Sequence, residues 1–206
     1  MGLKSVSLAA FLIAAPLAAQ DTFHGCGMKG TAKPAAIKAV NQLKNRYTAP
    51  ADQDVDAGVT LTAILAPGDD TDRFNEDNAA EIVGYVYDVK PGGKETCNCG
   101  ATDPALRDTH IELVPSLTLN DKTHRVIVEV TPRWREMMAA QGEDWSTDAL
   151  KARIKHKWIR VRGWLLFDVE HVGNANHTNP GGNNVWRATV WEVHPIAKLE
   201  VVGGPQ

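Results

Sequence analysis

Short segments in which apolar and polar residues alternate, many of them rich in β-branched side chains, follow one another from residue 59 to the end of the chain. Alternation of this kind is typical of half-buried β-strands. It predicts strands over 81–90, 108–114, 125–131, 157–168 and 185–202, the last with a break at Pro195. The segment 59–65 has a similar pattern and predicts an additional short strand.

Helices are predicted between the third and fourth of the longer strands. Residues 133–141 and 147–155 both have a helical pattern, and the second begins at a Ser-Thr pair that suits an N-cap. The order is therefore strand, strand, strand, helix, strand, strand. Gly84 and Gly163 lie inside the first and fourth of these strands, where they permit the bends that a small barrel needs.

This element order and glycine placement resemble the OB-fold, a small five-stranded Greek-key barrel. The resemblance implies a mainly β (α+β) fold, with an OB-like domain over 59–206, strands within 81–202 and a helix between strands three and four. It also implies that the loop 173–184, which joins the last two strands, contacts a ligand. A different small antiparallel barrel or a sandwich fits the same order.

The first residues have the pattern of a secretory signal peptide. Lys4 gives a positive start, 6–15 is apolar, and 17–19 is a small-residue exit. The apolar run is too short to span a bilayer, which takes roughly 20 residues. We therefore predict a signal peptide over 1–19, a periplasmic or secreted protein and no transmembrane segment.

Residues 20–58 form a predicted N-terminal extension with one amphipathic helix. Ile37, Val40 and Leu43 recur at helical spacing, and Pro34 suits the first helical turn. We expect this helix to pack on the main domain.

The overall charge gives no attraction to nucleic acid or to anionic membranes. The chain has 22 Lys and Arg against 25 Asp and Glu, a formal net charge of −3. Binding of a polyanion would therefore need a local basic patch.

The three cysteines predict one disulfide and one remaining thiol. A bridge between Cys97 and Cys99 would close a small, strained ring, so we expect Cys26 to pair with Cys97 or Cys99. The alternative is metal ligation by these thiolates together with His24, a donor set that suits Zn²⁺ or Cu⁺.

Ionisable side chains gather on one face of the predicted second strand. Asp108, His110 and Glu112 alternate along it, so their side chains point the same way. Glu129 of the neighbouring third strand is expected to lie beside them. These groups form either a solvated sheet face or the floor of a site.

Two histidines further along the chain extend this set. His171 follows the fourth strand, and His194 shares a face of the last strand with Glu192. Imidazole and carboxylate groups bind divalent metals or act as general acids and bases. The candidate metal ligands are Asp108, His110, Glu112, His171 and His194, for zinc or manganese, and the candidate catalytic residues are His110, Glu129 and His194. They predict a small metal-dependent hydrolase of phosphoesters or esters.

Arginines and tryptophans are frequent in the C-terminal half, a combination that binds sugars and single-stranded nucleic acid. The candidate ligand-binding residues are Arg133, Arg160, Arg162, Trp186 and Arg187. They predict an exported OB-type binding module for an extended oligosaccharide or polyanion, with nucleic acid as a further ligand class. This hypothesis is placed ahead of the hydrolase, since OB-type domains bind more often than they catalyse. A structural, envelope-associated domain is the third alternative.

Overall fold

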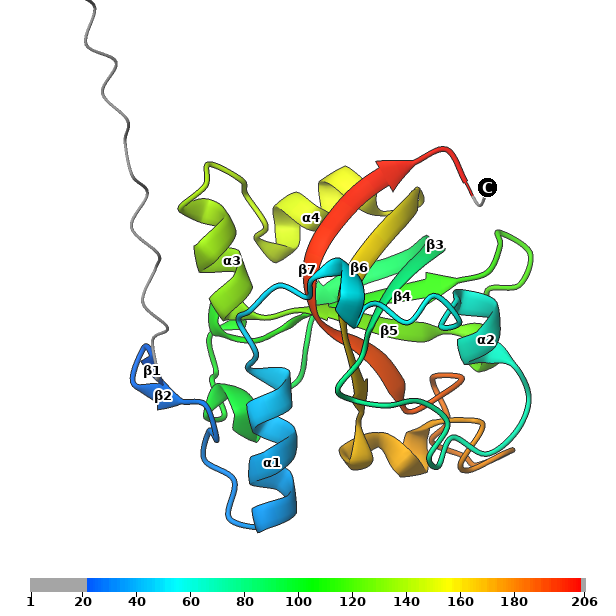
Figure 1. Ribbon diagram of the computed structural model, residues 1–206, viewed down its shortest axis with the longest axis horizontal. Coiled ribbons are helices and arrows are strands. Elements are labelled where there is room, and N and C mark those ends of the chain that lie inside the picture. The colour runs from blue at the N-terminus through cyan, green and yellow to red at the C-terminus, as the bar shows by residue number, and fades with distance from the viewer. Residues whose placement is uncertain (1–21, 205–206) are drawn as a thin grey trace, which may run out of the picture.

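The computed structural model describes residues 22–204, and its main body is a closed five-stranded β-barrel (Figure 1). The strands are β3 (Ala79–Pro91), β4 (Thr109–Val114), β5 (Val126–Val130), β6 (Trp158–Phe167) and β7 (Trp191–Val202). Their order around the barrel is β3-β4-β5-β7-β6. The long strand β3 closes it, because its first half pairs with β6 and its second half with β4.

Strands β5 and β7 are parallel neighbours, and the other pairs in the barrel are antiparallel. Counted along the chain, the third strand lies beside the fifth, and the first beside both the second and the fourth. With helices between the third and fourth strands, this is an OB-type arrangement. The predicted fold class is confirmed.

The two predicted helices are present as α3 (Pro132–Ala139) and α4 (Thr147–Ile154). The Ser146 hydroxyl caps α4 by accepting a hydrogen bond from the Ala149 amide, as the sequence predicted. Leu150 and Ile154 of α4 are fully buried in the hydrophobic core, so this helix contributes to the same core as the barrel.

Gly163 marks the sharpest irregularity of the barrel. A Cβ atom at this position would lie 2.3 Å from the Pro195 carbonyl oxygen, and the pairing of β6 with β7 shifts register on both sides of Gly163. The close approach of the two backbones requires glycine. Strand β7 continues through Pro195, so the predicted break is not an end of the strand. The pairing is nevertheless irregular there, because residues 193–198 of β7 face the shorter segment 162–165 of β6, and the His194–Pro195 peptide bond is cis.

Two strand predictions are wrong. Residues 59–65 contain a helix, α2 (Leu61–Leu65), whose N-cap is the Thr60 side chain and whose buried residues are Leu61 and Ile64. A short apolar run fits a strand and a helix equally well, and here the cap and the three-residue spacing decide. The last strand begins at Trp191, so 185–190 belongs to the preceding loop.

The N-terminal extension contains the predicted helix, α1 (Ala35–Lys44), preceded by a small hairpin of β1 (Thr22–Phe23) and β2 (Cys26–Gly27). The helix packs against β6 and β7, but with a polar face: its buried residues are Asn41 and Lys44. The surface beneath it is polar, so the polar residues of α1 turn inward. The predicted signal peptide, 1–19, lies outside the described residues.

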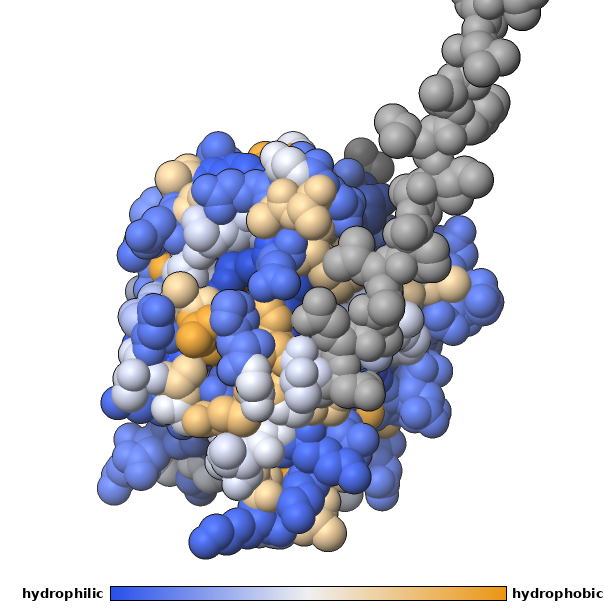
Figure 2. Space-filling model, turned by 90° about the vertical axis from the view of Figure 1, so that its left-hand side faces the viewer, coloured by the Kyte–Doolittle hydropathy of each residue, from blue (hydrophilic) through white to orange (hydrophobic). Residues whose placement is uncertain are grey.

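Short 3₁₀ helices complete the fold. They are η1 (Asp52–Asp54), η2 (Thr96–Asn98), η3 (Pro104–Leu106), η4 (Lys122–His124) and η5 (Val169–Asn174). Within residues 22–204, no helix has the length and apolar character that crossing a membrane requires. The side of the molecule that carries β1, β2 and α3 is mainly hydrophilic, with hydrophobic residues in small separate patches (Figure 2).

One outer face of the barrel is covered by the chain itself. Helix α1 and the loops 92–108 and 168–190 lie near the outward side chains of β4, β5 and β7. We call this the covered face; its residues are Asp108, which precedes β4, and His110, Glu112, Glu129, Glu192 and His194, each at most 8% exposed.

Candidate metal centre

The register of the strands places the ionisable side chains of the covered face next to one another. His110 is opposite Glu129 in the β4–β5 pair, and Glu192 is opposite Ile127 in the β5–β7 pair. Their neighbours in sequence, such as Ile111 and Val128, point into the barrel core. The convergence expected from the alternation is therefore present, and the face is buried rather than solvated.

Asp108, Glu129 and His194 form the centre of this face. One potential ligand atom from each lies within 4.8 Å of the others. His194 Nε2 is 3.9 Å from Asp108 Oδ2, and His194 Nδ1 is 3.6 Å from Glu129 Oε2. Among the described residues, Asp108 Oδ1, Glu129 Oε2 and His194 Nε2 have no hydrogen-bond partner, although all three are buried. Buried polar atoms without partners are costly.

The orientation of His194 is set by an ion pair behind it. Its Nδ1 lies 3.1 Å from Glu192 Oε2, and Arg187 Nη1 lies 2.5 Å from Glu192 Oε1. Because a carboxylate accepts, His194 donates from Nδ1, and Nε2 faces the side of Asp108. A carboxylate behind a histidine is the usual outer partner of a metal-binding imidazole.

The carboxylates of this centre outnumber the cations that they contact. Burial, together with the charge of Glu129, raises the pKa of Asp108 to about 7. Burial, together with the charge of Glu192, raises the pKa of Glu129 to about 8. Burial alone would lower the pKa of His194, but its hydrogen bond to Glu192 and the charges of Glu129 and Asp108 raise it to about 9. The metal-free centre therefore retains protons that a cation would displace.

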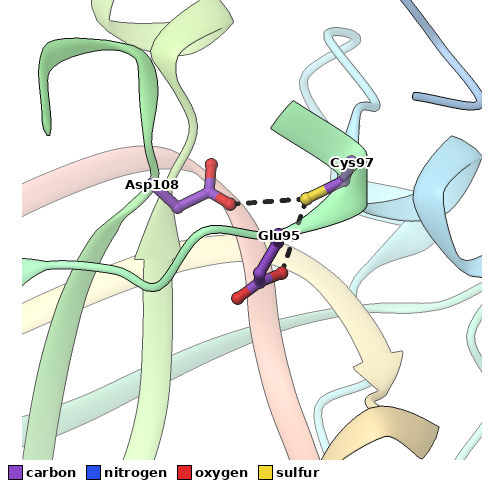
Figure 3. Close-up of side chains that lie close together, drawn as sticks. All are labelled: Glu95, Cys97 and Asp108. Carbon is purple, nitrogen blue, oxygen red and sulfur yellow. Dashed lines mark hydrogen bonds between the residues drawn. The ribbon is translucent and has the colours of Figure 1, made fainter. Parts of the chain in front are cut away.

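A second group of potential ligands shares Asp108. The Cys97 thiol lies between two carboxylates, with Sγ 3.4 Å from Glu95 Oε2 and 3.8 Å from Asp108 Oδ2 (Figure 3). These three residues also have ligand atoms within 4.8 Å of one another. Burial and the charges of Asp108 and Glu95 raise the pKa of Cys97 well above its usual value. Sequence reasoning missed Glu95, because a single loop carboxylate has no pattern.

The disulfide joins Cys26 to Cys99, with Cα atoms 5.9 Å apart, so the prediction of a Cys26 bridge is confirmed. Cys97 is the free cysteine and is buried. The bridge attaches the N-terminal hairpin to the segment that contains η2. Asn45 adds to this attachment by donating to the carbonyl oxygens of Met28 and Cys97.

Lys44 of α1 is the cation closest to the Glu95–Cys97 pair, and it was not predicted to take part. Its side chain is 1% exposed, and Nζ lies 2.7 Å from Glu95 Oε2, 3.0 Å from Asp168 Oδ2 and 3.7 Å from Glu170 Oε2. Burial opposes its charge, but the carboxylates of Asp168 and Glu95 raise its pKa well above the usual value. Lys44 is a permanent cation at the edge of the centre.

Two predicted metal ligands of strand β4 lie beside the centre. His110 Nδ1 is 3.1 Å from Glu129 Oε1, and burial with the charge of Lys90 lowers the His110 pKa to about 4. His110 is therefore neutral at pH 7 and orients Glu129. Glu112 is held by Lys90 Nζ at 2.5 Å and Arg125 Nη1 at 3.2 Å.

His171 lies at the rim. Its Nε2 is 3.8 Å from Asp168 Oδ2, and its ring packs edge-on against Trp186. Trp186 also packs against His110, with ring centroids 5.5 Å apart, and so covers that end of the face.

The four arginines predicted to bind a ligand lie in three separate places in the structure. Arg160 and Arg162 lie on β6 and both pair with Glu81. Arg187 is fully buried beneath the covered face. Arg133 of α3 is buried and donates to the Asn45 side chain.

A cavity of about 200 Å³ opens beside the centre. Its wall includes Cys97 and Asn98, and Asn98 Nδ2 donates to Asp108 Oδ2 at 2.8 Å. The cavity is also lined by His24, Cys26, Asn45 and Arg133, so of the predicted ligand-binding residues it contains Arg133.

Comparison with known proteins gives little further information. No family model matches the chain, and no curated protein matches it. Among solved structures, it is similar to Entamoeba histolytica asparaginyl-tRNA synthetase in complex with asparaginyl-adenylate, with 12% identity over 69% of this chain and a TM-score of 0.30. The synthetase alone matches with 11% identity and the same TM-score. This chain covers 24% of either synthetase chain. A likeness of this extent identifies neither a family nor an activity.

Proposed function

We propose that this protein is an OB-type binding module for a divalent metal ion, bound on the covered face by Asp108, Glu129 and His194. Two observations support this most: ligand atoms of the three residues lie within 4.8 Å of one another, and each residue has one buried polar atom without a hydrogen-bond partner among the described residues. Two carboxylates and one imidazole are ligands that zinc and manganese accept.

The charges of the neighbouring residues support a cation rather than an anion. Arg187 is paired with Glu192, and Lys44 is paired with Glu95 and Asp168. Asp108 and Glu129 are thus left with His194 as their nearest positive group. A divalent ion would compensate both carboxylates and release the protons that they otherwise retain.

The first test is the metal content of the untagged protein, purified without chelator and measured by plasma mass spectrometry. We expect at least one equivalent of zinc or manganese. Added to metal-free protein at 100 times its dissociation constant, the ion should stabilise the fold by about 2.7 kcal/mol. No bound metal in either experiment would refute the proposal.

Two isosteric variants separate ligation from general effects on folding. Glu129→Gln should weaken metal binding by more than the roughly 100-fold that loss of an outer-shell partner costs. Glu112→Gln removes an equally buried carboxylate that Lys90 and Arg125 already neutralise, and it should leave binding unchanged. Equal losses in both variants would contradict the assignment of Glu129.

The extended oligosaccharide or polyanion predicted from the sequence would need a continuous basic groove. Arg160 and Arg162 are neutralised by Glu81, Glu200 and Asp52, and Arg187 is buried. The arrangement therefore supports a small cation better than a long anionic chain. Glycan and single-stranded nucleic-acid arrays test the earlier hypothesis directly.

A metal-dependent hydrolase is the second candidate function. It is favoured by the cavity beside Cys97 and Asn98, because Asn98 contacts Asp108 and a small substrate there would lie close to the ion. A bound metal lowers the pKa of water and polarises phosphoryl or acyl oxygens. Hydrolysis of nitrophenyl phosphate or acetate that requires metal and is lost in Glu129→Gln would establish it.

We also propose that the protein works in an oxidising compartment, the periplasm or the cell exterior. The support is the Cys26–Cys99 disulfide together with the signal-peptide pattern of residues 1–19. Fractionation of expressing cells, with N-terminal sequencing of the mature chain, tests this proposal.

A further inference from the structure

Asp108 belongs to both groups of potential ligands, and this is the feature from which a second site follows. Its side chain is 3% exposed. Oδ2 accepts from Asn98 Nδ2 at 2.8 Å and lies 3.8 Å from Cys97 Sγ and 3.9 Å from His194 Nε2, whereas Oδ1 has no hydrogen-bond partner among the described residues. The carboxylate therefore lies between the two groups, in the place that a bridging carboxylate has in two-metal sites.

The spacing around Cys97 agrees with metal ligation. With bonds of about 2.0 Å to oxygen and 2.3 Å to sulfur, tetrahedral ligands of one zinc ion are about 3.5 Å apart. Cys97 Sγ is 3.4 Å from Glu95 Oε2 and 3.8 Å from Asp108 Oδ2. Figure 3 shows the thiol sulfur of Cys97 turned toward the carboxylates of both Glu95 and Asp108.

Lys44 does not prevent an ion from binding here. Its ammonium group contacts Glu95, but it also contacts Asp168 at 3.0 Å and Glu170 at 3.7 Å. If Glu95 turned to a metal ion, Lys44 would keep two carboxylate partners and would remain compensated.

The cavity provides access to this position. Cys97, Asn98 and Cys99 line it, whereas Glu129 and His194 are not part of its lining. An ion at Cys97 would therefore be the outer of the two and could keep a position open toward the cavity.

We infer that Glu95, Cys97 and Asp108 form a second, outer metal position in the same centre, bridged to the inner position by Asp108 and selective for a thiophilic ion such as Zn²⁺ or Co²⁺. This inference rests on the proposed function, since Asp108 is also a ligand of the inner ion. A thiolate ligand favours zinc and cobalt over magnesium, calcium and manganese.

The test is titration of metal-free protein, with its disulfide intact, with Co²⁺ and separately with Zn²⁺. We expect two equivalents of either ion and a sulfur-to-cobalt charge-transfer absorption in the near ultraviolet. Cys97→Ser should abolish the absorption and bind one equivalent. Glu112→Gln, the matched buried carboxylate, should keep both equivalents and the absorption.

The outcomes separate the inference from the proposed function. One equivalent without the absorption overturns the outer position and leaves the inner site standing. One equivalent with the absorption means that Cys97 binds a single ion, which also overturns a second position. No binding refutes both. If Cys97→Ser does not fold, as judged by circular dichroism, Glu95→Gln replaces it and should likewise bind one equivalent.

Discussion

Replacing Lys44 with methionine tests how strongly the covered face depends on buried charge. Lys44 is 1% exposed and lies 2.7 Å and 3.0 Å from Glu95 and Asp168, the second of which is also 1% exposed. Methionine retains most of the volume of the side chain but leaves both carboxylates without their cation. Breaking a buried ion pair from one side costs about 3–5 kcal/mol, so we expect Lys44→Met to lose this much in urea unfolding.

The pair of Lys155 and Asp88 is the control, because its Nζ–Oδ1 distance is also 2.7 Å while its side chains are 31% and 28% exposed. Lys155→Met should cost less than about 1 kcal/mol. At equal distance, the two pairs differ in their access to water, so similar losses would refute the argument from burial. If Lys44→Met does not fold, adding Asp168→Asn should restore folding.

The pH dependence of this loss is also fixed by the structure. The pKa of Lys44 is raised in the folded protein, so its contribution to stability is fully present below the unfolded value of about 10.4 and declines only above it. Lys44 also lowers the pKa values of Glu95, Asp108 and Glu129, so without it the folded state holds more protons on these carboxylates. The stability lost in Lys44→Met should therefore be larger at pH 9 than at pH 6. A loss that shrinks as the pH rises over this range would contradict the assignment of a permanent cation.

Further predictions concern the disulfide, the barrel and the metal-free centre. Reducing the disulfide, which closes a separation of 73 residues, should lower the unfolding free energy by about 4 kcal/mol, measured by urea titration with and without reductant. Gly163→Ala should cost at least about 3 kcal/mol, since its Cβ would lie 2.3 Å from the Pro195 carbonyl, whereas Gly173→Ala, with open space around it, should stay within about 0.5 kcal/mol. In the presence of a chelator, the pKa values of Asp108 (about 7) and Glu129 (about 8) are raised in the folded state, which therefore holds more protons than the unfolded state above pH 4. The melting temperature should for this reason fall between about pH 4 and pH 8. A melting temperature that rises over this range would contradict the assigned shifts.

The barrel was predictable because its signals are local. Each signal depends on a single strand or helix: alternation along each strand, a helix cap at Ser146 and a glycine at position 163. Together these signals predicted the order of elements of an OB-fold. The same reasoning predicted that Glu129 lies beside the ionisable residues of the neighbouring strand, but the register that puts Glu129 opposite His110 came from the structure. The prediction of a strand over 59–65 was wrong, because the spacing of apolar residues in a segment of seven residues does not distinguish a strand from a helix.

The surroundings of the centre could not be predicted, because they depend on contacts between distant segments. Periodicity in α1 identified Ile37, Val40 and Leu43 as its apolar face, but the helix buries Asn41 and Lys44. An amphipathic pattern shows which residues of a helix form its apolar face and which form its polar face. It does not show which of the two faces packs against the rest of the protein. Here the surface is acidic, so the polar side of the helix is the complementary one.

The position of Arg187 also could not be predicted from the sequence around it. Beside Trp186, it had the composition of a ligand-binding surface, yet it lies fully buried against Glu192 and the Thr189 carbonyl. Its position follows from the way the loop 168–190 folds back over β7, which no local pattern encodes. A charged residue in a polar loop can equally line a groove or neutralise a buried carboxylate, and only its partners decide.

The proposal of a small cation as the ligand follows from the covered face. The outer faces of OB barrels that bind oligomers are open, so that an extended ligand can lie across the strands. In this chain, α1 and two loops cover the face, and the groups beneath them are mainly carboxylates. A ligand that reaches Asp108, Glu129 and His194 must therefore be small, and it must carry positive charge to replace the protons held there. Both conditions describe a metal ion, and the thiol of Cys97 at the edge of the same cluster makes zinc a better match than a hard cation such as calcium.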